Sequence, residues 1–465
     1  MKKLTLIFYT VLITLTTYGQ DITGKWNGIL KVQGTQLRLV ININQSDNGY
    51  KSTLDSPDQG AKDIPVTQTS FEDSILEFES SSLGVSYSGT LNNEGVINGT
   101  FNQMGQSIPL NFSKEEVEKE KLVRPQEPKK PYPYYSEEVS FANSIDSISL
   151  AGTLTLPSRE GKNPVVVMIT GSGPQNRDEE LLGHKPFLVI ADHLTKKGIG
   201  VLRFDDRGTA KSNGDFNSAT SKDFANDVLS AVTYLKTRSD IDYKNIGLVG
   251  HSEGGLIAPM VASDSKDIAF IVLLAGPGIS GYDILLRQTE LIAKANGSDE
   301  LELQTELSLL KGGLDIILKG NNLDVIKSDL RDFMQKELND HPELLPEGMK
   351  VDNYISSTVD QLATPWFQYF MKYDPTSSLV KVRCPVLAIN GEKDLQVPSK
   401  INLNAIEKYL EEGGNNDFVA KELPNLNHLF QECSTGSPNE YAEIEQTFSP
   451  RALLEISNWI LNKVK

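Results

Sequence analysis

Cysteine is scarce in this sequence, which contains only Cys384 and Cys433 in 465 residues. Cys384 opens a strand-like segment whose far end carries Asp394, and Cys433 follows His428. An extended strand advances about 3.3 Å per residue, so if the Asp394 and His428 side chains meet, Cys384 should lie far from them. A disulfide requires Cα atoms within about 7 Å of each other. We therefore expect two unpaired thiols.

Positive charge and histidine are also in short supply. The chain has 45 Lys and Arg against 62 Asp and Glu, a net charge of −17, and only five histidines. Such an acidic chain repels phosphate backbones, and no basic stripe interleaved with aromatic residues offsets the charge. No histidine pair or acidic cluster has metal-ligand spacing, and neither G-K-[ST] nor G-x-G-x-x-G occurs. We expect no nucleic-acid partner, no metal and no cofactor.

Long apolar runs are confined to the first 20 residues. Lys2 and Lys3 precede the apolar residues 4–15, and small residues follow near Gly19, which is the pattern of a cleaved signal peptide. The apolar run is shorter than the roughly 20 residues that span a bilayer, and no cysteine is present there for lipid attachment. We expect signal removal, export to the periplasm or medium of a bacterium, and no remaining membrane span.

Residues 21–113 have the pattern of an all-β domain. Short alternating segments such as 37–43 and 85–91 are separated by clusters of Gly, Asn, Asp and Ser, as in a small antiparallel barrel or sandwich. Gly24-Lys25-Trp26 resembles the G-x-W opening of lipocalin-like barrels. The domain could grip substrate or could simply pack as a β appendage. We favour the appendage because nothing in this stretch carries recognisable chemistry.

The charged, proline-rich segment 114–135 predicts a linker, and the pattern of apolar residues changes after it. From 136 to 465, apolar strand-like runs such as 165–169 and 201–204 alternate with helix-like stretches such as 222–237. This alternation predicts an α/β fold with a mostly parallel, doubly wound sheet. Residues 281–379 contain no convincing strand, so we expect an inserted helical cap. Within it, Trp366, Phe367, Tyr369, Phe370 and Met371 could line an acyl pocket or serve as ordinary packing.

A candidate nucleophile lies at Ser252. Residues 250–255 read Gly-His-Ser-Glu-Gly-Gly, after the apolar residues 246–249 and before a helix-like run. A G-x-S-x-G sequence between a strand and a helix forms a tight turn with the serine at its tip. Glycines on both sides are needed because a Cβ there would crowd the turn or the helix.

A serine hydroxyl needs a base and an orienting carboxylate, which follow on this scaffold in the order Ser, Asp or Glu, His. Two histidines follow Ser252. His341 lies in the cap without a strand to position it, whereas His428 follows a predicted strand, so His428 is the expected base. Glu392 and Asp394 both follow the strand after the cap. The G-x-x-D spacing before a hydrophobic residue and a proline favours Asp394.

The developing oxyanion needs two preorganised N–H donors. One should be the backbone of Glu253, directly after the nucleophile at a helix N-terminus. The other should come from residues 170–174, which read Thr-Gly-Ser-Gly-Pro. Within that turn we expect the backbone of Ser172 to be the donor, with Gly173 as the next choice.

From about residue 136 to the end, the chain resembles the α/β-hydrolase superfamily, and specifically bacterial carboxylesterases with a Gly-His-Ser-Glu-Gly-Gly elbow. Serine aminopeptidases are similar and share the triad. The matching pieces occur in the family's order: 171–174 with Arg177-Asp178, 206–208 with Ser212, 250–255, 391–394, and Asn427-His428. One departure is Thr170, where many members have a histidine. In this pattern Arg207 is structural, and His184 and Arg177 could face the site.

The resemblance implies an α/β-hydrolase fold and a serine esterase that acts through an acyl-enzyme on small ester substrates. The alternative is a peptidase that releases N-terminal residues from short peptides. It would need a carboxylate for the substrate's α-amine, and Glu253 and Glu290 are possible. A third possibility, a non-catalytic binding protein on this scaffold, is disfavoured because every catalytic position is filled.

Overall fold

The computed structural model describes residues 21–32, 35–47, 49–80, 83–103, 106–118, 123–345 and 349–464. The predicted signal peptide, residues 1–20, lies outside the described residues. The chain forms two compact units. The first contains the strands up to residue 113, and the second contains almost all of the chain from residue 123 onward.

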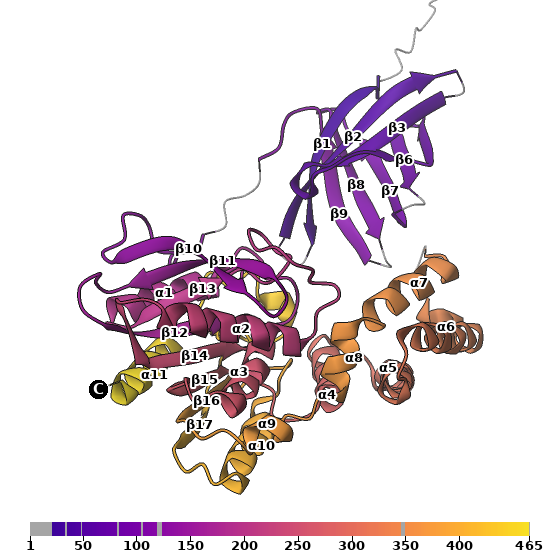
Figure 1. Cartoon of the computed structure of the whole chain (residues 1–465). Coiled ribbons are helices and arrows are strands. Elements are labelled where there is room, and N and C mark those ends of the chain that lie inside the picture. Colours follow the sequence, from indigo (N-terminus) through magenta and orange to yellow (C-terminus); the bar gives the residue numbers. More distant parts are fainter. Residues whose placement is uncertain are drawn as a thin grey trace, which may run out of the picture. The chain divides into compact units, whose positions relative to one another are not determined.

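The first unit is a single curved β-sheet, a half-barrel, in which sequence neighbours pair as in a meander (Figure 1). The strand order is β4-β3-β2-β1-β9-β8-β7-β6-β5. The strands are β1 Gly24–Val32, β2 Thr35–Ser46, β3 Gly49–Ser56, β4 Ala61–Pro65, β5 Gln68–Glu72, β6 Ile75–Ser80, β7 Val85–Leu91, β8 Val96–Gln103 and β9 Gln106–Ser113. Near the two ends of the sheet, the Ser52 hydroxyl of β3 lies 2.6 Å from the Thr69 hydroxyl of the end strand β5.

Large side chains fill the concave side of this sheet. Trp26, Phe78, Tyr87 and Phe112 are all buried, and the Phe78 and Tyr87 rings stack at 5.0 Å. The Trp26 indole N–H donates to the Ile22 carbonyl at 2.7 Å, which satisfies the polar atom of a buried ring. The period-2 alternation in the sequence thus corresponds to a packed interior of this half-barrel.

The second unit is built on an eight-stranded sheet of order β10-β11-β13-β12-β14-β15-β16-β17. The pairs β10–β11 and β11–β13 are antiparallel, and the remaining pairs are parallel. The strands are β10 Tyr135–Asn143, β11 Ile148–Leu156, β12 Asn163–Ile169, β13 Gly200–Phe204, β14 Ile241–His251, β15 Phe270–Leu274, β16 Val386–Gly391 and β17 Phe418–Leu423. This is the predicted mostly parallel sheet.

Helices cover both faces of that sheet, so its central strands are apolar throughout. In β12, Val165 and Val167 pack on one side, with α2 Ser221–Lys236, α3 Glu253–Asp264 and α10 Ser399–Glu412. The alternate residues Val166 and Met168 pack on the other side, with α1 Pro186–Lys196 and α11 Pro450–Lys463. The doubly wound prediction is confirmed.

The cap connects β15 to β16 and consists of helices that share their own apolar core (Figure 1). They are α4 Gly281–Ala295, α5 Glu300–Lys319, α6 Leu323–Asp340, α7 Val351–Leu362 and α8 Pro365–Lys372. The short helix α9 Thr376–Leu379 follows them, and its Leu379 packs in the core of the sheet instead. Phe367 and Met371 belong to the apolar core of the cap. For these two residues, ordinary packing is the alternative that fits, because both side chains are buried in the core of the cap.

The predicted linker is only partly a linker. Arg124 donates hydrogen bonds to the carbonyls of Ala442 at 2.8 Å and Leu182 at 3.1 Å, and Tyr134 donates to Asp192 at 3.0 Å. Gln126 binds the loop before α11 as well, because its oxygen accepts from the Thr447 N–H at 2.7 Å. Polar side chains therefore bind residues 123–134 to the rest of the second unit. Charge and proline content alone do not predict such contacts.

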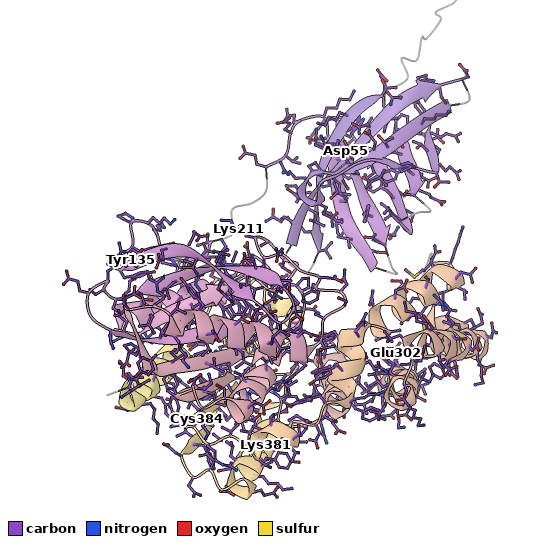
Figure 2. The ribbon with its side chains drawn as sticks, viewed as in Figure 1. Asp55, Tyr135, Lys211, Glu302, Lys381 and Cys384 are labelled. Carbon is purple, nitrogen blue, oxygen red and sulfur yellow. The ribbon has the colours of Figure 1, made fainter. Side chains whose placement is uncertain are left out.

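Both cysteines are free thiols, as expected. Cys384 precedes β16 (Figure 2), and Cys433 lies in the loop beyond β17. Burial raises the pKa of both thiols, to about 12 for Cys384 and to about 11 for Cys433. Neither thiol is therefore an activated nucleophile.

Candidate active site

The elbow at the end of β14 holds Ser252 in a strained backbone conformation. Its φ of 51° and ψ of −116° lie in a region that non-glycine residues rarely adopt. A Cβ added to Gly250 would lie 2.0 Å from the Gly254 carbonyl oxygen, and one added to Gly254 would lie 2.1 Å from the Ile169 carbonyl oxygen. Both glycines are therefore required by the close approach of β12, β14 and α3.

The glycine requirement leads to a first prediction. The change Gly250→Ala should lower the free energy of unfolding by about 3 kcal/mol, because backbone atoms cannot move aside cheaply. The control is Gly313→Ala in α5, where the added Cβ meets only the Leu330 side chain at 3.7 Å. That change should raise stability by up to about 1 kcal/mol, since alanine is the better helix former. Urea denaturation measures both, and equal midpoints for the two variants would contradict the argument.

Asp394 and His428 lie at the carboxyl ends of the neighbouring strands β16 and β17. The His428 Nδ1–H donates to Asp394 Oδ2 at 2.8 Å, and both side chains are almost fully buried. The other carboxylate oxygen, Oδ1, accepts the backbone N–H groups of Gln396 at 2.9 Å and Val397 at 2.8 Å. The carboxylate is thus fixed on both sides, so it holds the imidazole with Nε2 directed away from it.

The alternative residues from the sequence lie elsewhere. Glu392 accepts the backbone N–H of Asn425 at 3.0 Å, and the His428 imidazole is bonded to Asp394 instead. His341 is exposed in the cap, where it pairs with Glu343 at 3.0 Å. Ser252 itself is partly exposed, and among the described residues its hydroxyl forms no hydrogen bond with His428. The structure therefore brings Asp394 and His428 together and leaves the serine hydroxyl unengaged.

The expected oxyanion donors lie on the two segments next to Ser252. A Cβ added to Gly171 would lie 3.3 Å from the Ser252 Cβ, so the loop after β12 passes directly over the elbow. The Gly171 N–H is already used, because it donates to the Glu179 carboxylate at 2.7 Å. In the described part of the chain, neither the Ser172 nor the Glu253 N–H has a protein acceptor. Glu253 also begins α3, where the helix dipole favours negative charge.

The side chain of Glu253 points into the protein and contacts the cap. Its carboxylate accepts the Ser221 hydroxyl at 2.6 Å and the Trp366 indole N–H at 2.7 Å, and burial raises its pKa. A second contact joins the end of α4 to the loop beyond His428, since Asn296 accepts the Ser437 hydroxyl at 2.9 Å. Trp366 is therefore a cap-to-elbow contact, a role that its place in an aromatic cluster did not predict.

This contact gives a second prediction. Trp366→Phe removes one of two donors to a buried carboxylate and should lower the free energy of unfolding by about 1–3 kcal/mol. In a double-mutant cycle with Glu253→Gln, the loss should shrink because the neutral amide needs less solvation. Trp459→Phe is the control, since the Trp459 ring packs edge-on against Phe270. Additive effects in the cycle would rule out the contact as a source of stability.

Thr170, the departure from the family pattern, has a definite partner. Its hydroxyl donates to Asp206 Oδ1 at 2.8 Å, and the Gln175 backbone N–H donates to the other oxygen at 2.9 Å. Burial raises the pKa of Asp206 well above its usual range, and the nearby carboxylate of Glu253 raises it further. These hydrogen bonds to Asp206 tie the loop after β12 to the end of the neighbouring strand β13.

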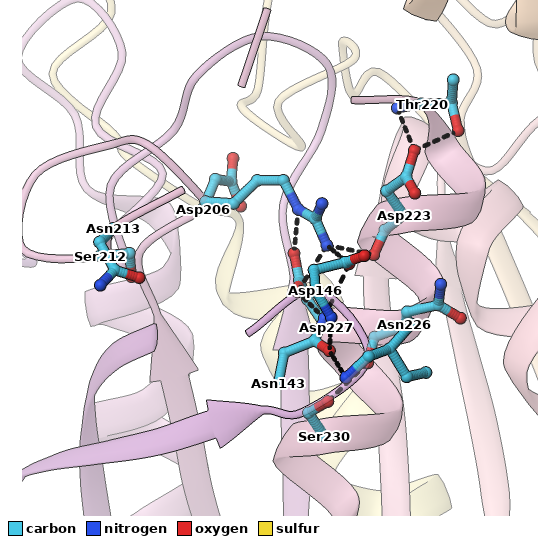
Figure 3. Close-up of polar contacts among 12 residues, drawn as sticks. Asn143, Asp146, Asp206, Ser212, Asn213, Thr220, Asp223, Asn226, Asp227 and Ser230 are labelled. Atoms are coloured by element: carbon cyan, nitrogen blue, oxygen red, sulfur yellow. Dashed lines mark hydrogen bonds and ion pairs between the residues drawn. The ribbon is translucent and has the colours of Figure 1, made fainter. Parts of the chain in front are cut away.

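Arg207 is structural, as expected. Its guanidinium donates to Asp227 at 2.7 and 2.9 Å and to Asp146 at 2.8 Å, and Asn143 donates to Asp227 at 2.7 Å (Figure 3). Arg177 and His184 are occupied in the same way. Arg177 binds Asp205 at 2.7 Å, and His184 lies between Thr447 at 3.0 Å and the Tyr441 carbonyl at 2.9 Å. Burial lowers the pKa of His184 to about 4, so it is neutral at pH 7.

Two residues of the site were missed by the sequence reading. Glu179 and His251 form a buried pair 2.9 Å apart beside the elbow, and the ring of His251 lies 4.9 Å from the ring of His428. In the sequence, His251 was noted only as part of the elbow motif, and no role was predicted for it. Glu179 gave no signal, because its side-chain partner His251 lies 72 residues further along the chain.

Within the described ranges, no cluster of three or more His, Cys, Asp or Glu side chains is arranged to hold a metal ion. A search of the same residues found no helix with the length and apolarity needed to cross a membrane.

The strand order, the elbow and the Asp394–His428 pair define the second unit as an α/β-hydrolase, a hydrolytic enzyme fold. Residues 146–413, more than half of the chain, match the family model described as X-Pro dipeptidyl-peptidase (S15 family). The protein belongs to this family. The match includes Ser252 and Asp394 and ends before His428.

Individual relatives include esterases. The chain is 27% identical over 332 residues to Esterase EstD of Thermotoga maritima, covering 71% of this chain and 70% of the relative. It is 33% identical over 142 residues to Thiohydrolase apmlB of Arthrinium phaeospermum, covering 30% of this chain and 42% of the relative. A solved esterase structure from Pyrococcus furiosus is similar with a TM-score of 0.43 and 17% identity, over 74% of this chain and 97% of that chain.

Proposed function

We propose that this protein is an exported serine hydrolase that cleaves carboxylic esters through an acyl-enzyme. The observation that carries the proposal is the buried Asp394–His428 pair, 2.8 Å apart, at the same edge of the sheet as the strained Ser252 elbow. Ser252 is the nucleophile, His428 the general base and Asp394 the residue that orients His428. Ester cleavage at such a site needs no metal or cofactor.

The reaction follows from this arrangement. As Ser252 Oγ attacks the ester carbonyl carbon, its proton passes to His428 Nε2, and the carbonyl oxygen becomes an oxyanion facing the Glu253 and Ser172 N–H groups. When the ester C–O bond breaks, His428 returns the proton to the leaving alkoxide, which departs as an alcohol. Water then attacks the acyl-serine by the same steps, releasing the carboxylic acid and the free enzyme.

Ester cleavage is favoured over N-terminal peptide cleavage because the two carboxylates that could bind a substrate's α-amine already have partners in the protein. The Glu253 carboxylate already binds Ser221 and Trp366, and the Glu290 carboxylate pairs with Lys294 at 2.6 Å on the same helix. The relative from Thermotoga maritima is an esterase by name. The family match keeps a second candidate in view, a peptidase that acts on X-Pro sequences.

A direct comparison of substrates separates the two candidates. p-Nitrophenyl esters of increasing acyl length and acetylated sugars should be assayed beside aminoacyl- and X-Pro-p-nitroanilides. Ester turnover that exceeds anilide turnover is the expected result. Rapid anilide turnover with negligible ester turnover would overturn the esterase proposal while leaving the serine mechanism intact.

The same panel should be repeated after removal of the β unit. Residues 21–118 can be deleted, but Arg124 and Gln126 should be kept because they bind the second unit. Unchanged kinetics would support the appendage interpretation. Export is proposed from residues 1–20 alone, and N-terminal sequencing of protein from the medium or periplasm should find a mature end near Gln20.

A further inference from the structure

A second buried carboxylate–imidazole pair, Glu179 and His251, lies beside the catalytic pair. His251 Nδ1 is 2.9 Å from Glu179 Oε1, and His251 Nε2 is 3.0 Å from the backbone carbonyl oxygen of His428. His251 directly precedes Ser252 in the chain. The imidazole of His251 therefore bridges the loop after β12 and the loop that carries His428.

The two partners of His251 determine its protonation. A carboxylate and a carbonyl oxygen both accept hydrogen bonds, whereas a neutral imidazole has only one N–H. Neutral His251 would leave one ring nitrogen facing an oxygen at about 3 Å with no proton between them. Only the imidazolium donates to both oxygens, so this geometry favours a buried cation adjacent to the nucleophile.

Glu179 extends the connection to the oxyanion loop. The same Oε1 that faces His251 also accepts the Gly171 N–H at 2.7 Å. Gly171 directly precedes Ser172, the expected donor to the oxyanion. One carboxylate oxygen thus fixes the loop that carries this donor, and through His251 it also fixes the backbone of His428.

Few other charges act on His251. The ionisable groups that face it are Glu179, His428 and Asp394, and the remaining surroundings are apolar, with Phe187 and Leu274 among them. Burial by itself lowers the pKa of His251, but the charge and hydrogen bond of Glu179, the His428 carbonyl and the charge of Asp394 together raise it overall. The imidazolium is therefore present below its ordinary pKa of about 6.5 and is lost only as pH rises through the raised value.

We propose that Glu179 and His251 are a positioning pair, in which the His251 imidazolium holds the oxyanion loop and the catalytic histidine in register with Ser252. The proposal rests on the proposed function, because the register matters only if Ser252 and His428 act together. Neither residue touches the reacting atoms. Their effect is on geometry, where a misplacement of about 1 Å can cost roughly 100-fold in rate.

The first test compares variants of Glu179 across pH. Glu179→Gln keeps the shape and removes the charge, so kcat at pH 7 should fall about 10- to 100-fold with KM changed less than about 3-fold. Because the pKa of His251 falls when its carboxylate partner is removed, alkaline loss of kcat should begin at lower pH than in the wild type. Glu179→Asp retains the charge and should restore part of that alkaline range.

The chain offers a matched control in the pair His341 and Glu343, which is exposed in the cap. Its nitrogen–oxygen distance is 3.0 Å, close to the 2.9 Å between His251 and Glu179. Glu343→Gln should leave kcat and its pH profile unchanged. A purely structural role for Glu179 would lower thermal stability without moving the alkaline limb. An unchanged alkaline limb in Glu179→Gln would therefore overturn the proposal.

A second measurement uses the wild-type enzyme and does not depend on any variant folding. With only five histidines in the chain, ¹³C,¹⁵N-histidine labelling resolves each ring by NMR, and His251 is assigned in the wild type by through-bond correlation of its ring with its own backbone. Both His251 nitrogens should carry protons at about pH 6, below the ordinary histidine pKa, and a neutral ring at that pH would overturn the proposal. Failure of the wild type to react with a fluorophosphonate would instead refute the proposed function.

Discussion

Replacing Ser252 with alanine should abolish ester hydrolysis, with kcat reduced on the order of 10⁵- to 10⁶-fold. The reason is that no other group in the site can form the acyl-enzyme, so only the residual effect of binding and the oxyanion donors remains. The enzyme should also lose all labelling by a fluorophosphonate. Hydrolysis of a p-nitrophenyl ester and gel detection of the label measure the two effects.

The fold should tolerate this change. The Ser252 side chain is only partly buried, and removal of one hydroxyl leaves the elbow glycines in place. The thermal midpoint should therefore stay close to that of the wild type. Ser265→Ala, just after the same helix α3, is the matched control and should retain full labelling. Persistent labelling of Ser252→Ala would show that the nucleophile has been wrongly assigned.

The second large effect is expected at the orienting carboxylate. Asp394→Asn should lower kcat by about 10⁴-fold. Two backbone N–H groups, from Gln396 and Val397, point at Oδ1 and will select the amide oxygen of the asparagine for that position. The amide NH₂ then faces His428 Nδ1, which must accept. The proton of the neutral ring is thereby moved to Nε2. A protonated Nε2 cannot accept the proton of the Ser252 hydroxyl, so His428 cannot act as the base.

Glu392→Gln is the matched control for this prediction, because Glu392 was the other carboxylate that the sequence allowed. It accepts one backbone N–H from Asn425, and glutamine can still do so through its oxygen. Its kcat should stay within about 2-fold of the wild type. If Glu392→Gln lost activity while Asp394→Asn kept it, the two roles would be reversed.

The sequence was most informative where the determinants are local. The Ser252 elbow was predictable because strand, glycine turn and helix follow one another within about 20 residues. Asp394 and His428 were predictable because each follows a strand end, and parallel strands bring their carboxyl ends to one edge of the sheet. The period-2 and helical patterns indicated an all-β unit and a helical cap, respectively, but the choice between barrel and sandwich was left open.

Contacts between distant segments could not be predicted. Glu179 meets His251 across 72 residues, and Trp366 meets Glu253 across 113 residues. No spacing rule encodes such pairs, since they depend on how loops are arranged above the sheet. For the same reason, a charged and proline-rich segment suggested a linker up to residue 135, although its side chains from Arg124 onward bind the second unit.

The contacts of Arg124 and Gln126 have a consequence for how the enzyme folds. Apart from the bond to Leu182, they join residues separated by 318 to 322 positions, with partners in the loop between His428 and α11. Contacts of such long range form only after the intervening chain has been gathered. The loop between His428 and α11 is thus held by residues near the start of its own unit, so these contacts can form only after almost the whole unit has been synthesised.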